Sequence, residues 1–214
     1  LRGDASNEGT GNNYRVRNRL CGLVACPPGT NTGVLGDIIN SGPLYVGPPP
    51  FDYPTSLETP SYPAFRDLAA NKNRTPIIYA GANDGMLHGF DAKTGEELLA
   101  YVPHEMYPNL SKLTDPAYSH RYYVDGNPTA LDAYVNGNWK TVLAGGLNKG
   151  GTSIYALDVT DPSGFTTSNA DDIFLWEFKD PNLGYTYGTP VIARMQNGKW
   201  AVIFGNGYNN VSSG

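Results

Sequence analysis

The sequence predicts an all-β fold, and three observations carry this prediction. Short runs of β-branched and aromatic residues alternate with turns rich in glycine, asparagine and proline along the 214 residues. Aromatic residues make up 12% of the chain and charged residues only 16%, a composition typical of a folded, strand-rich protein. Residues 126–146 and 188–207 also repeat the same order of strand, turn and tryptophan.

Residues 75–103 contain the clearest unit of this pattern. Each expected strand is apolar and rich in β-branched or aromatic residues. The sequence Asn83-Asp84-Gly85 separates the first two, because glycine accepts the positive φ that tight turns require. A second turn is expected at residues 91–95, and the strands are expected at residues 77–80, 86–90 and 98–102. Three strands joined by two such turns are typical of a propeller blade.

The segments before this unit are predicted to be a strand pair, a loop and a helix. Residues 35–47 are expected to form the strand pair. Residues 48–63 are expected to form a loop, because their prolines prevent ladder pairing. The only expected helix spans residues 64–70, where Phe65 and Leu68 share one apolar face.

The second unit repeats the plan of the first. Residues 126–146 and 188–207 both begin with Gly-x-Pro and continue through a strand, an Asn-Gly turn, a tryptophan (Trp139 or Trp200) and a β-branched strand. We therefore expect about two and a half four-stranded blades of a larger β-propeller, with long loops and one short helix. The blades are expected over about residues 36–103, 126–178 and 188 onward, with a long connection at residues 104–123.

The predicted propeller is incomplete. Residues 1–34 are expected to be an irregular N-terminal segment with a cysteine loop, and residues 35–214 the partial propeller. Closed propellers usually have about 4–8 blades, and an open arc leaves unpaired strand edges. The remaining blades are therefore expected from sequence outside this chain or from a partner chain. Because the chain begins at Leu1 rather than methionine, we interpret it as a processed product or an excised piece.

Charge and hydropathy exclude two classes of partner. The formal net charge of −5 provides no electrostatic basis for binding nucleic acid. No apolar run reaches the roughly 18 residues that a membrane-spanning helix requires. We therefore expect no nucleic-acid partner and no membrane span.

The only two cysteines, Cys21 and Cys26, are predicted to form a local disulfide that closes a loop. Two free thiols are the alternative. A metal site would require further ligands, and none lie nearby in the sequence. If the two sulfurs are bonded, the compartment is oxidising.

The remaining polar candidates are expected to be structural. His88 lies in an expected inner strand, where a hydrogen-bonded core imidazole is the usual case. Zinc would require three or four converging ligands, and His104 and Glu105 together with His120 give such a site only weak support. Isolated carboxylates are expected to stabilise turns; these are Asp84, Asp91, Asp115, Asp125 and Asp158. The sequence predicts neither a catalytic residue nor a metal ligand.

Tyrosines crowd the expected loops, and two interpretations of them remain open. Aromatic side chains on loops held by a rigid scaffold form contact surfaces. The same side chains could instead cover the strand ends as a local core. The residues concerned are Tyr45, Tyr53, Tyr62, Tyr101, Tyr107, Tyr118, Tyr122 and Tyr123.

Several of these segments together resemble one protein family. The residues at 79–91, 107–115 and 120–126 closely resemble the C-terminal propeller of the PilY1-like (PilC-like) type IV pilus tip proteins. Further similar segments occur in the order found in that family, at residues 1–4, 35–40, 156–162 and 204–209. Residues 10–33, with the cysteine loop, depart from the family pattern.

The resemblance implies a non-enzymatic role in pilus biogenesis and surface adhesion. Members of this family lie at the pilus tip or the bacterial outer surface, after passing through the periplasm. The implied partners are pilus tip subunits and a host-surface receptor or glycan. Family members also bind calcium in an Asp-rich loop, but no such loop occurs here, so we expect no cofactor in this segment and calcium only elsewhere in the full-length protein.

The tripeptide Arg2-Gly3-Asp4 is a candidate receptor-binding site. Integrins recognise this tripeptide, because its carboxylate completes a receptor metal site while its arginine pairs with acidic groups. The alternative is that Arg2 and Asp4 form structural hydrogen bonds or an ion pair at a blade edge.

A quinoprotein-like oxidoreductase propeller is the alternative function. Residues 91–95 resemble part of the repeat that docks neighbouring blades in quinone-dependent dehydrogenases. Gly89 replaces the alanine of that repeat, and Leu99 stands where its tryptophan belongs. Catalysis would also require an aspartate beside a calcium-bound quinone, and the sequence shows no such cluster.

Overall fold

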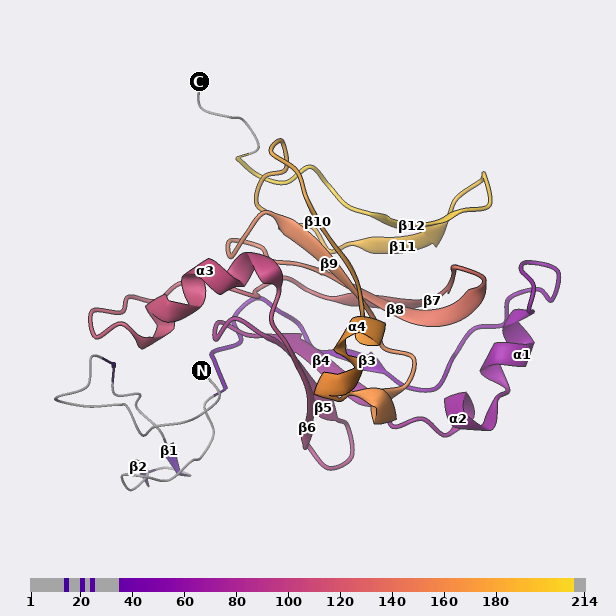
Figure 1. Cartoon of the computed structure of the whole chain (residues 1–214), viewed down its shortest axis with the longest axis horizontal. Helices are drawn as coiled ribbons and strands as arrows, with labels where there is room; N and C mark the ends of the chain where they lie inside the picture. The colour runs from indigo at the N-terminus through magenta and orange to yellow at the C-terminus, as the bar shows by residue number, and fades with distance from the viewer. Residues whose placement is uncertain (1–13, 16–19, 22–23, 26–34, 210–214) are drawn as a thin grey trace.

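The computed structural model describes residues 14–15, 20–21, 24–25 and 35–209 of the chain. Its strands form separate antiparallel sheets that follow one another along the chain. In Figure 1 the sheets lie one above another, from the magenta sheet at the bottom through orange to the yellow pair at the top. The short strands β1 (Leu20–Cys21) and β2 (Val24–Ala25) pair with each other.

The first large sheet, blade one, has the order β3-β4-β5-β6 and is antiparallel throughout. Its strands are β3 (Leu44–Val46), β4 (Ile77–Gly81), β5 (Leu87–Asp91) and β6 (Glu97–Tyr101). The three strands predicted within residues 75–103 are confirmed, and β3 adds a fourth at the β4 edge.

The second large sheet, blade two, has the order β10-β9-β8-β7. Its strands are β7 (Thr129–Val135), β8 (Asn138–Gly146), β9 (Ser153–Asp158) and β10 (Phe174–Lys179). The turn between β7 and β8 consists of Asn136 and Gly137, with φ of 50° and 83°. Both values are positive, as a two-residue hairpin turn of type I′ requires.

A third sheet contains β11 (Val191–Arg194) and β12 (Trp200–Ile203), which pair with each other. Their connection is longer than the Asn136-Gly137 turn: Met195 N donates to Lys199 O at 2.7 Å, and only Gly198 has positive φ, 83°. The same dipeptide therefore forms two turn types in the two repeats. Two four-stranded blades and a strand pair confirm the predicted fold class, an all-β partial propeller.

The prediction of a single helix at residues 64–70 was wrong. Two short helices, α1 (Tyr62–Arg66) and α2 (Ala69–Lys72), occupy this region. Leu68 between them has extended backbone, with ψ of 135°, and its side chain is 56% exposed. Buried Tyr62 and Phe65 anchor α1 instead, so the apolar face assigned from Leu68 does not exist.

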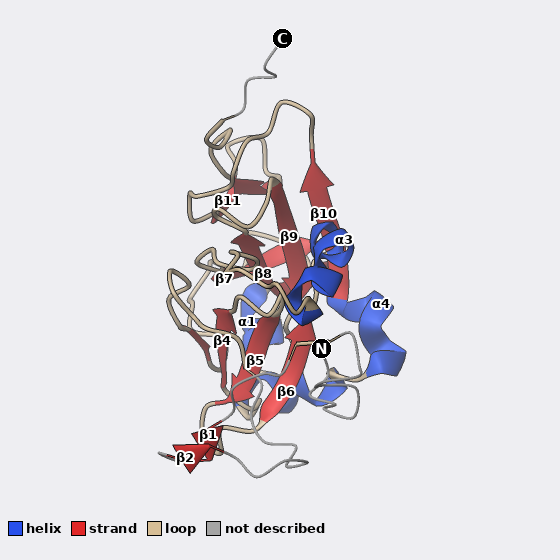
Figure 2. Ribbon diagram, turned by 90° about the vertical axis from the view of Figure 1, so that its left-hand side faces the viewer, coloured by secondary structure: helices blue, strands red, loops and turns tan. Residues whose placement is uncertain are grey.

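Short helical turns also occur in connections that the sequence suggested to be irregular. They are η1 (His104–Met106), α3 (Tyr107–Leu110), η2 (Ser111–Thr114), η3 (Pro162–Gly164), η4 (Thr167–Asn169) and α4 (Ala170–Ile173). Figure 2 shows these helices outside the stacked strands. Across the described residues, no helix combines the length and apolar character needed to cross a bilayer.

The strand expected at the start of residues 35–47 is absent, and only β3 forms there. Its place is taken by an irregular segment that binds a turn of blade one and the linker that leads into blade two. Gly36 N donates to Asp84 Oδ2 at 2.7 Å, and Asn40 Nδ2 donates to Asp125 Oδ2 at 2.7 Å. Since these polar groups have partners outside a ladder, the segment follows the blade surface instead of joining a sheet.

The main core lies between blades one and two. Tyr79 and Leu87 from blade one and Leu143 and Tyr155 from blade two are all fully buried in one cluster. A side chain of this size contributes about 1.5–3 kcal/mol when it is fully buried. The two blades therefore form one packed body rather than two independent sheets.

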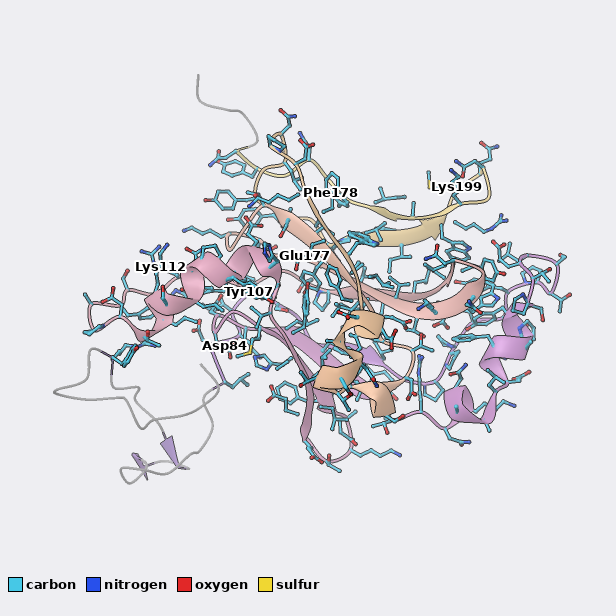
Figure 3. The ribbon with its side chains drawn as sticks, viewed as in Figure 1. Asp84, Tyr107, Lys112, Glu177, Phe178 and Lys199 are labelled. Carbon is cyan, nitrogen blue, oxygen red and sulfur yellow. The ribbon has the colours of Figure 1, made fainter. Side chains whose placement is uncertain are left out.

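A polar contact joins the outer strands of these blades. Glu177 on β10 accepts hydrogen bonds from the Tyr101 hydroxyl on β6 and from His104 N, the latter at 2.7 Å. Nearby, Lys179 Nζ lies 3.0 Å from Glu105 Oε1. Figure 3 labels Glu177 beside the chain segment that leads to Tyr107.

Residues 48–66, which we call the strap, extend from blade one to the other two sheets. Strap residues Tyr53 and Tyr62 pack against Trp139 of β8, with ring centroids 5.5 and 4.9 Å away. Trp139 in turn meets Trp200 of β12 edge-on at 5.6 Å. The two tryptophans that define the sequence repeat thus share one aromatic cluster, in which strap residues take part.

Candidate functional site

The sequence-predicted site residues mostly lie outside the described part of the chain. Arg2, Gly3 and Asp4 lie outside it, as do Cys26 and the side chain of Cys21. The receptor-binding tripeptide and the disulfide therefore remain predictions.

Within the described residues, a polar cleft with a volume of about 310 Å³ lies where three connecting segments meet. The first segment is α3 together with the linker, residues 115–128, which leads into blade two. The second is the β8–β9 turn, residues 147–152, and the third is the loop after β10, residues 180–190. The residues that give the cleft its chemistry are Asn109, Arg121, Tyr122, Tyr123, Lys149 and Tyr185. Figure 3 labels Tyr107 and Lys112, which flank Asn109 in sequence.

The linker wall is fixed by hydrogen bonds to blade one. Tyr123 N donates to Asn83 Oδ1 at 3.0 Å, and the Tyr123 hydroxyl donates to Asn109 O at 3.1 Å. His120 Nε2 pairs with Asp37 Oδ2 at 2.7 Å, at the mouth of the same wall. Burial raises the pKa of the Tyr123 phenol, which therefore stays protonated at neutral pH.

The second wall is the tight turn between β8 and β9, which presents Lys149. Asn148 has φ of 49°, and its amide Nδ2 donates to the buried carbonyl of Asp125 at 2.8 Å. Gly150 N closes the turn by donating to Leu147 O at 2.8 Å. A Cβ on Gly150 would lie 1.7 Å from the carbonyl oxygen of Tyr123, so only glycine allows the two walls to approach this closely.

The third wall is the loop that carries Tyr185. Thr186 Oγ1 accepts from Leu147 N at 2.8 Å, and Thr186 N donates to Gly151 O at 3.3 Å. Tyr185 exchanges backbone hydrogen bonds with Tyr208 at 2.7 and 3.0 Å. All three walls are thus cross-linked by hydrogen bonds that involve backbone groups.

The cleft carries positive charge on a negatively charged chain. Arg121 and Lys149 are exposed, and Lys149 Nζ lies 5.2 Å from the ring centroid of Tyr122. None of the lining residues is a carboxylate, although the chain has a net charge of −5. Two cations, several phenol rings and an amide form a binding surface for an anionic or hydroxylated group.

In the structure, the three candidate zinc ligands each contact a different partner. His120 pairs with Asp37, while Glu105 Oε2 accepts from Thr152 N at 3.1 Å. The ring of His104 packs edge-on against Tyr107, with centroids 5.2 Å apart. Among the residues that the structure describes, no group of three or more His, Cys, Asp or Glu side chains is arranged to hold a metal ion.

The isolated aspartates stabilise turns, as predicted, with one exception. Asp91 Oδ1 accepts from Lys93 N at 2.7 Å, and Asp115 and Asp158 accept from the backbone in the same way at 2.8 and 3.0 Å. Asp84 accepts from Met86 N within its own turn at 3.2 Å. Asp125 instead binds Asn40, 85 residues away, and so joins the surface segment to the linker.

His88 is the buried histidine that the sequence predicted, and both its ring nitrogens have partners. Nε2 lies 3.0 Å from Asp84 Oδ2, and Nδ1 binds Glu97 Oε1. Burial alone would lower the pKa of His88, but the hydrogen bonds and negative charge of the two carboxylates hold the pKa above its ordinary value. The site is an ion-pair cluster inside blade one, away from the cleft lining.

The core interpretation is confirmed for two of the tyrosines, and the contact-surface interpretation stays a prediction for the exposed ones. Tyr62 and Tyr123 are fully buried and belong to the core. Tyr45 and Tyr107 are 63% and 56% exposed. Tyr122 is half-buried and lines the cleft, where its ring contacts His120 edge-on with centroids 5.2 Å apart.

Sequence reasoning did not identify Arg121, Lys149 or Tyr185 as candidate site residues. They lie in three connections far apart in the chain, and only the packing of the blades brings them together. One signal was available: residues 148–151 read Asn-Lys-Gly-Gly, a turn sequence that presents a lysine at its tip.

Comparison with known proteins identifies the family. A family model described as the PilY1 beta-propeller domain matches residues 35–214. The chain is 43% identical over 223 residues to a type IV pilus biogenesis factor PilY1 of Pseudomonas aeruginosa, covering 99% of this chain and 17% of that protein. It is 44% identical to a PilY1 homolog of Xylella fastidiosa, covering 99% of this chain and 14% of the homolog.

A solved structure gives the same result. The crystal structure of the Pseudomonas aeruginosa PilY1 C-terminal domain matches with a TM-score of 0.59 and 41% identity. The match covers 77% of this chain and 32% of the crystallised chain. This chain thus spans less than a fifth of the curated relatives named above and about a third of the solved domain. The chain belongs to the PilY1 β-propeller family.

Proposed function

We propose that this chain is the part of a type IV pilus biogenesis factor that supports pilus assembly and surface adhesion by binding. The observation that carries the proposal is the similarity to proteins named as type IV pilus biogenesis factors, which extends over 99% of the chain. The relatives' names point to a pilus-associated place at the cell surface, and we infer the extracellular pilus tip.

A rigid platform is compatible with a function in binding. The cleft walls are fixed by backbone hydrogen bonds, and connections held by a stable scaffold are the usual place for contact residues. We infer a domain boundary near residue 34, with the propeller from residue 35 onward. Its partners would be the remaining blades, pilus tip subunits and a host-surface receptor or glycan, with calcium bound only elsewhere in the full-length protein.

The quinoprotein alternative has no specific observation in its favour. At Gly89, where that repeat has alanine, a Cβ would lie 2.9 Å from the Tyr79 ring. Leu99, which stands in place of the tryptophan, packs against the core between blades one and two. The relatives are named for pilus biogenesis and not for an enzymatic activity.

Deleting residues 35–214 from the full-length gene in its own bacterium tests the proposal. We expect fewer surface pili in sheared fractions and loss of twitching motility. Adhesion to host cells should be compared in a background in which pilus retraction is blocked, so that strains with equal numbers of pili are compared. Unchanged piliation and unchanged adhesion would overturn the proposed function, and loss of piliation alone would overturn its adhesive part.

A further inference from the structure

We propose that the cleft formed by Arg121, Tyr122, Lys149 and Tyr185 binds an anionic carbohydrate, a sugar that carries a carboxylate. The inference rests on the proposed adhesive function and specifies the ligand class and the residues. It is carried by the combination of cations and aromatic rings in one fixed hollow.

The two cations come from independent segments and face the same hollow. Arg121 belongs to the linker before blade two, and Lys149 to the β8–β9 turn. With respect to the described carboxylates, neither side chain forms an ion pair, whereas seven other basic side chains or histidines do. A guanidinium and an ammonium that pair with no carboxylate of the described residues are suited to a ligand carboxylate, because charge-assisted hydrogen bonds are the strongest that side chains form.

The aromatic rings favour a sugar over a simple anion. Tyr122 and Tyr185 are half-buried and line the hollow. A pyranose ring has an apolar C–H face that packs against an aromatic ring, and its hydroxyls bond to phenol and amide groups of the kind that Tyr185 and Asn109 provide. Lys149 Nζ lies 5.2 Å from the centroid of the Tyr122 ring, so one sugar could contact both the ammonium group and the aromatic ring.

The shape of the hollow favours a sugar over an acidic peptide. Its volume of about 310 Å³ is at the lower end of the range for small-molecule sites, roughly 300–1,000 Å³. An extended peptide usually binds along a groove or a free strand edge. The cleft is instead a compact hollow lined by Tyr123, Gly150 and Tyr185, whose segments are cross-linked by hydrogen bonds.

The fixed walls should also favour binding of the sugar, even though the contact area is small. Asn148, Thr186 and Tyr123 are each held through buried or half-buried hydrogen bonds to another wall or to blade one. A pre-organised site loses little conformational entropy when a ligand binds. Because the cations are exposed, binding should weaken as ionic strength rises through the physiological range.

The test is titration of the purified full-length protein with sialyllactose, lactose, inorganic phosphate and an acidic peptide, by calorimetry or ligand-observed NMR. The variants are Arg121→Ala, Lys149→Ala and the matched control Lys199→Ala. Lys199 is an exposed lysine in the β11–β12 connection, and Figure 3 labels it far from Lys112. Thermal unfolding of each variant establishes that it is folded.

We expect sialyllactose to bind and lactose to bind at least about tenfold more weakly, as the loss of one charge-assisted hydrogen bond implies. Phosphate should also bind at least about tenfold more weakly, because it has no sugar ring to pack against the tyrosines. Arg121→Ala and Lys149→Ala should each weaken sialyllactose binding about tenfold or more, and Lys199→Ala less than about twofold. Equal binding of lactose would overturn the role of the carboxylate. Equal binding of phosphate or tighter binding of the peptide would overturn the sugar assignment, and absence of sialyllactose binding would overturn the proposal altogether.

The same variants separate this inference from the proposed function. In the bacterium, Arg121→Ala should leave piliation and twitching unchanged and reduce adhesion to sialylated cells. If the deletion of residues 35–214 abolishes adhesion but Arg121→Ala does not, the carbohydrate site is wrong and the adhesive function stands. If neither change affects adhesion while the purified protein still binds sialyllactose, the adhesive function is wrong and the site stands.

Discussion

Replacing Arg74 with methionine should weaken the packing of blade one against blade two and so lower the free energy of unfolding. Arg74 lies between α2 and β4 and is only 7% exposed. Its Nε donates to Gly47 O at 2.6 Å, and its Nη1 donates to Thr141 Oγ1 at 2.6 Å. Thr141 Oγ1 donates in turn to Asp132 Oδ1 at 2.5 Å, so a hydroxyl connects a buried guanidinium to a buried carboxylate.

The magnitude follows from these bonds. A hydrogen bond to a charged group contributes about 1.5–3 kcal/mol, and Arg74 makes two short ones. Burial lowers the pKa of Arg74, and the charge of Asp132 opposes that effect, so removal of Arg74 leaves the Asp132 carboxylate without its nearby cation. We expect Arg74→Met to lower the free energy of unfolding by about 3–5 kcal/mol.

Thermal unfolding of the purified full-length protein, followed by circular dichroism, measures the effect. Because the match covers only 32% of the solved PilY1 domain, the cooperative unit is larger than this chain, and the loss corresponds to a fall in Tm of about 3–5 °C. Thr141→Val, which removes only the connecting hydroxyl, should lower Tm by part of the fall expected for Arg74→Met. Arg66→Met is the matched control, because Arg66 makes its contacts to Asp52 and Asp67 at the surface. Equal Tm values for Arg74→Met and Arg66→Met would refute the reasoning.

Three further predictions concern other contacts. His88→Gln should destabilise the protein most below about pH 6.5. The pKa of His88 is raised in the folded protein, so protonated His88 stabilises the fold at low pH, and this contribution is lost as pH rises through the raised pKa. A difference in Tm between the original protein and the variant that grows with pH would contradict this prediction. Glu177→Ala should lower the free energy of unfolding in urea by about 2 kcal/mol through loss of its charged hydrogen bonds, whereas an unchanged urea midpoint would show that these bonds add nothing. Gly150→Ala should lower both Tm and sialyllactose affinity, whereas Gly188→Ala, with nothing within 4 Å of its new Cβ, should change neither; equal behaviour of the two variants would contradict the close approach at Gly150.

The elements that the sequence predicted correctly depend on local patterns. The β4–β6 unit combines apolar strands with glycine turns, and the β7–β8 hairpin has an Asn136-Gly137 turn between two alternating strands. In such units the residues that decide the conformation lie within a few positions of one another. A single sequence is therefore sufficient to recognise them.

The elements that the sequence did not predict depend on contacts between distant segments. Leu68 fits a helical pattern, but the chain becomes extended there because Tyr62 and Phe65 fix α1 against the strap aromatics and Trp139. Residues 35–40 have strand composition, yet their polar groups bond to Asp84 and Asp125 in other units. The cleft arises in the same way, since its three walls meet only when blade two has packed beside blade one.

The strap also joins the third sheet to an earlier part of the chain. Glu58 of the strap, which precedes blade one's β4, accepts hydrogen bonds from Arg194 Nε at 2.8 Å and from Trp200 Nε1 at 3.1 Å in the third sheet. A chimera that takes β11 and β12 from one relative and the strap from another would separate these partners. In a chimera, the unit to exchange is therefore not a single blade but the third sheet together with residues 48–66. Chimeras that take both parts from the same relative should keep these hydrogen bonds.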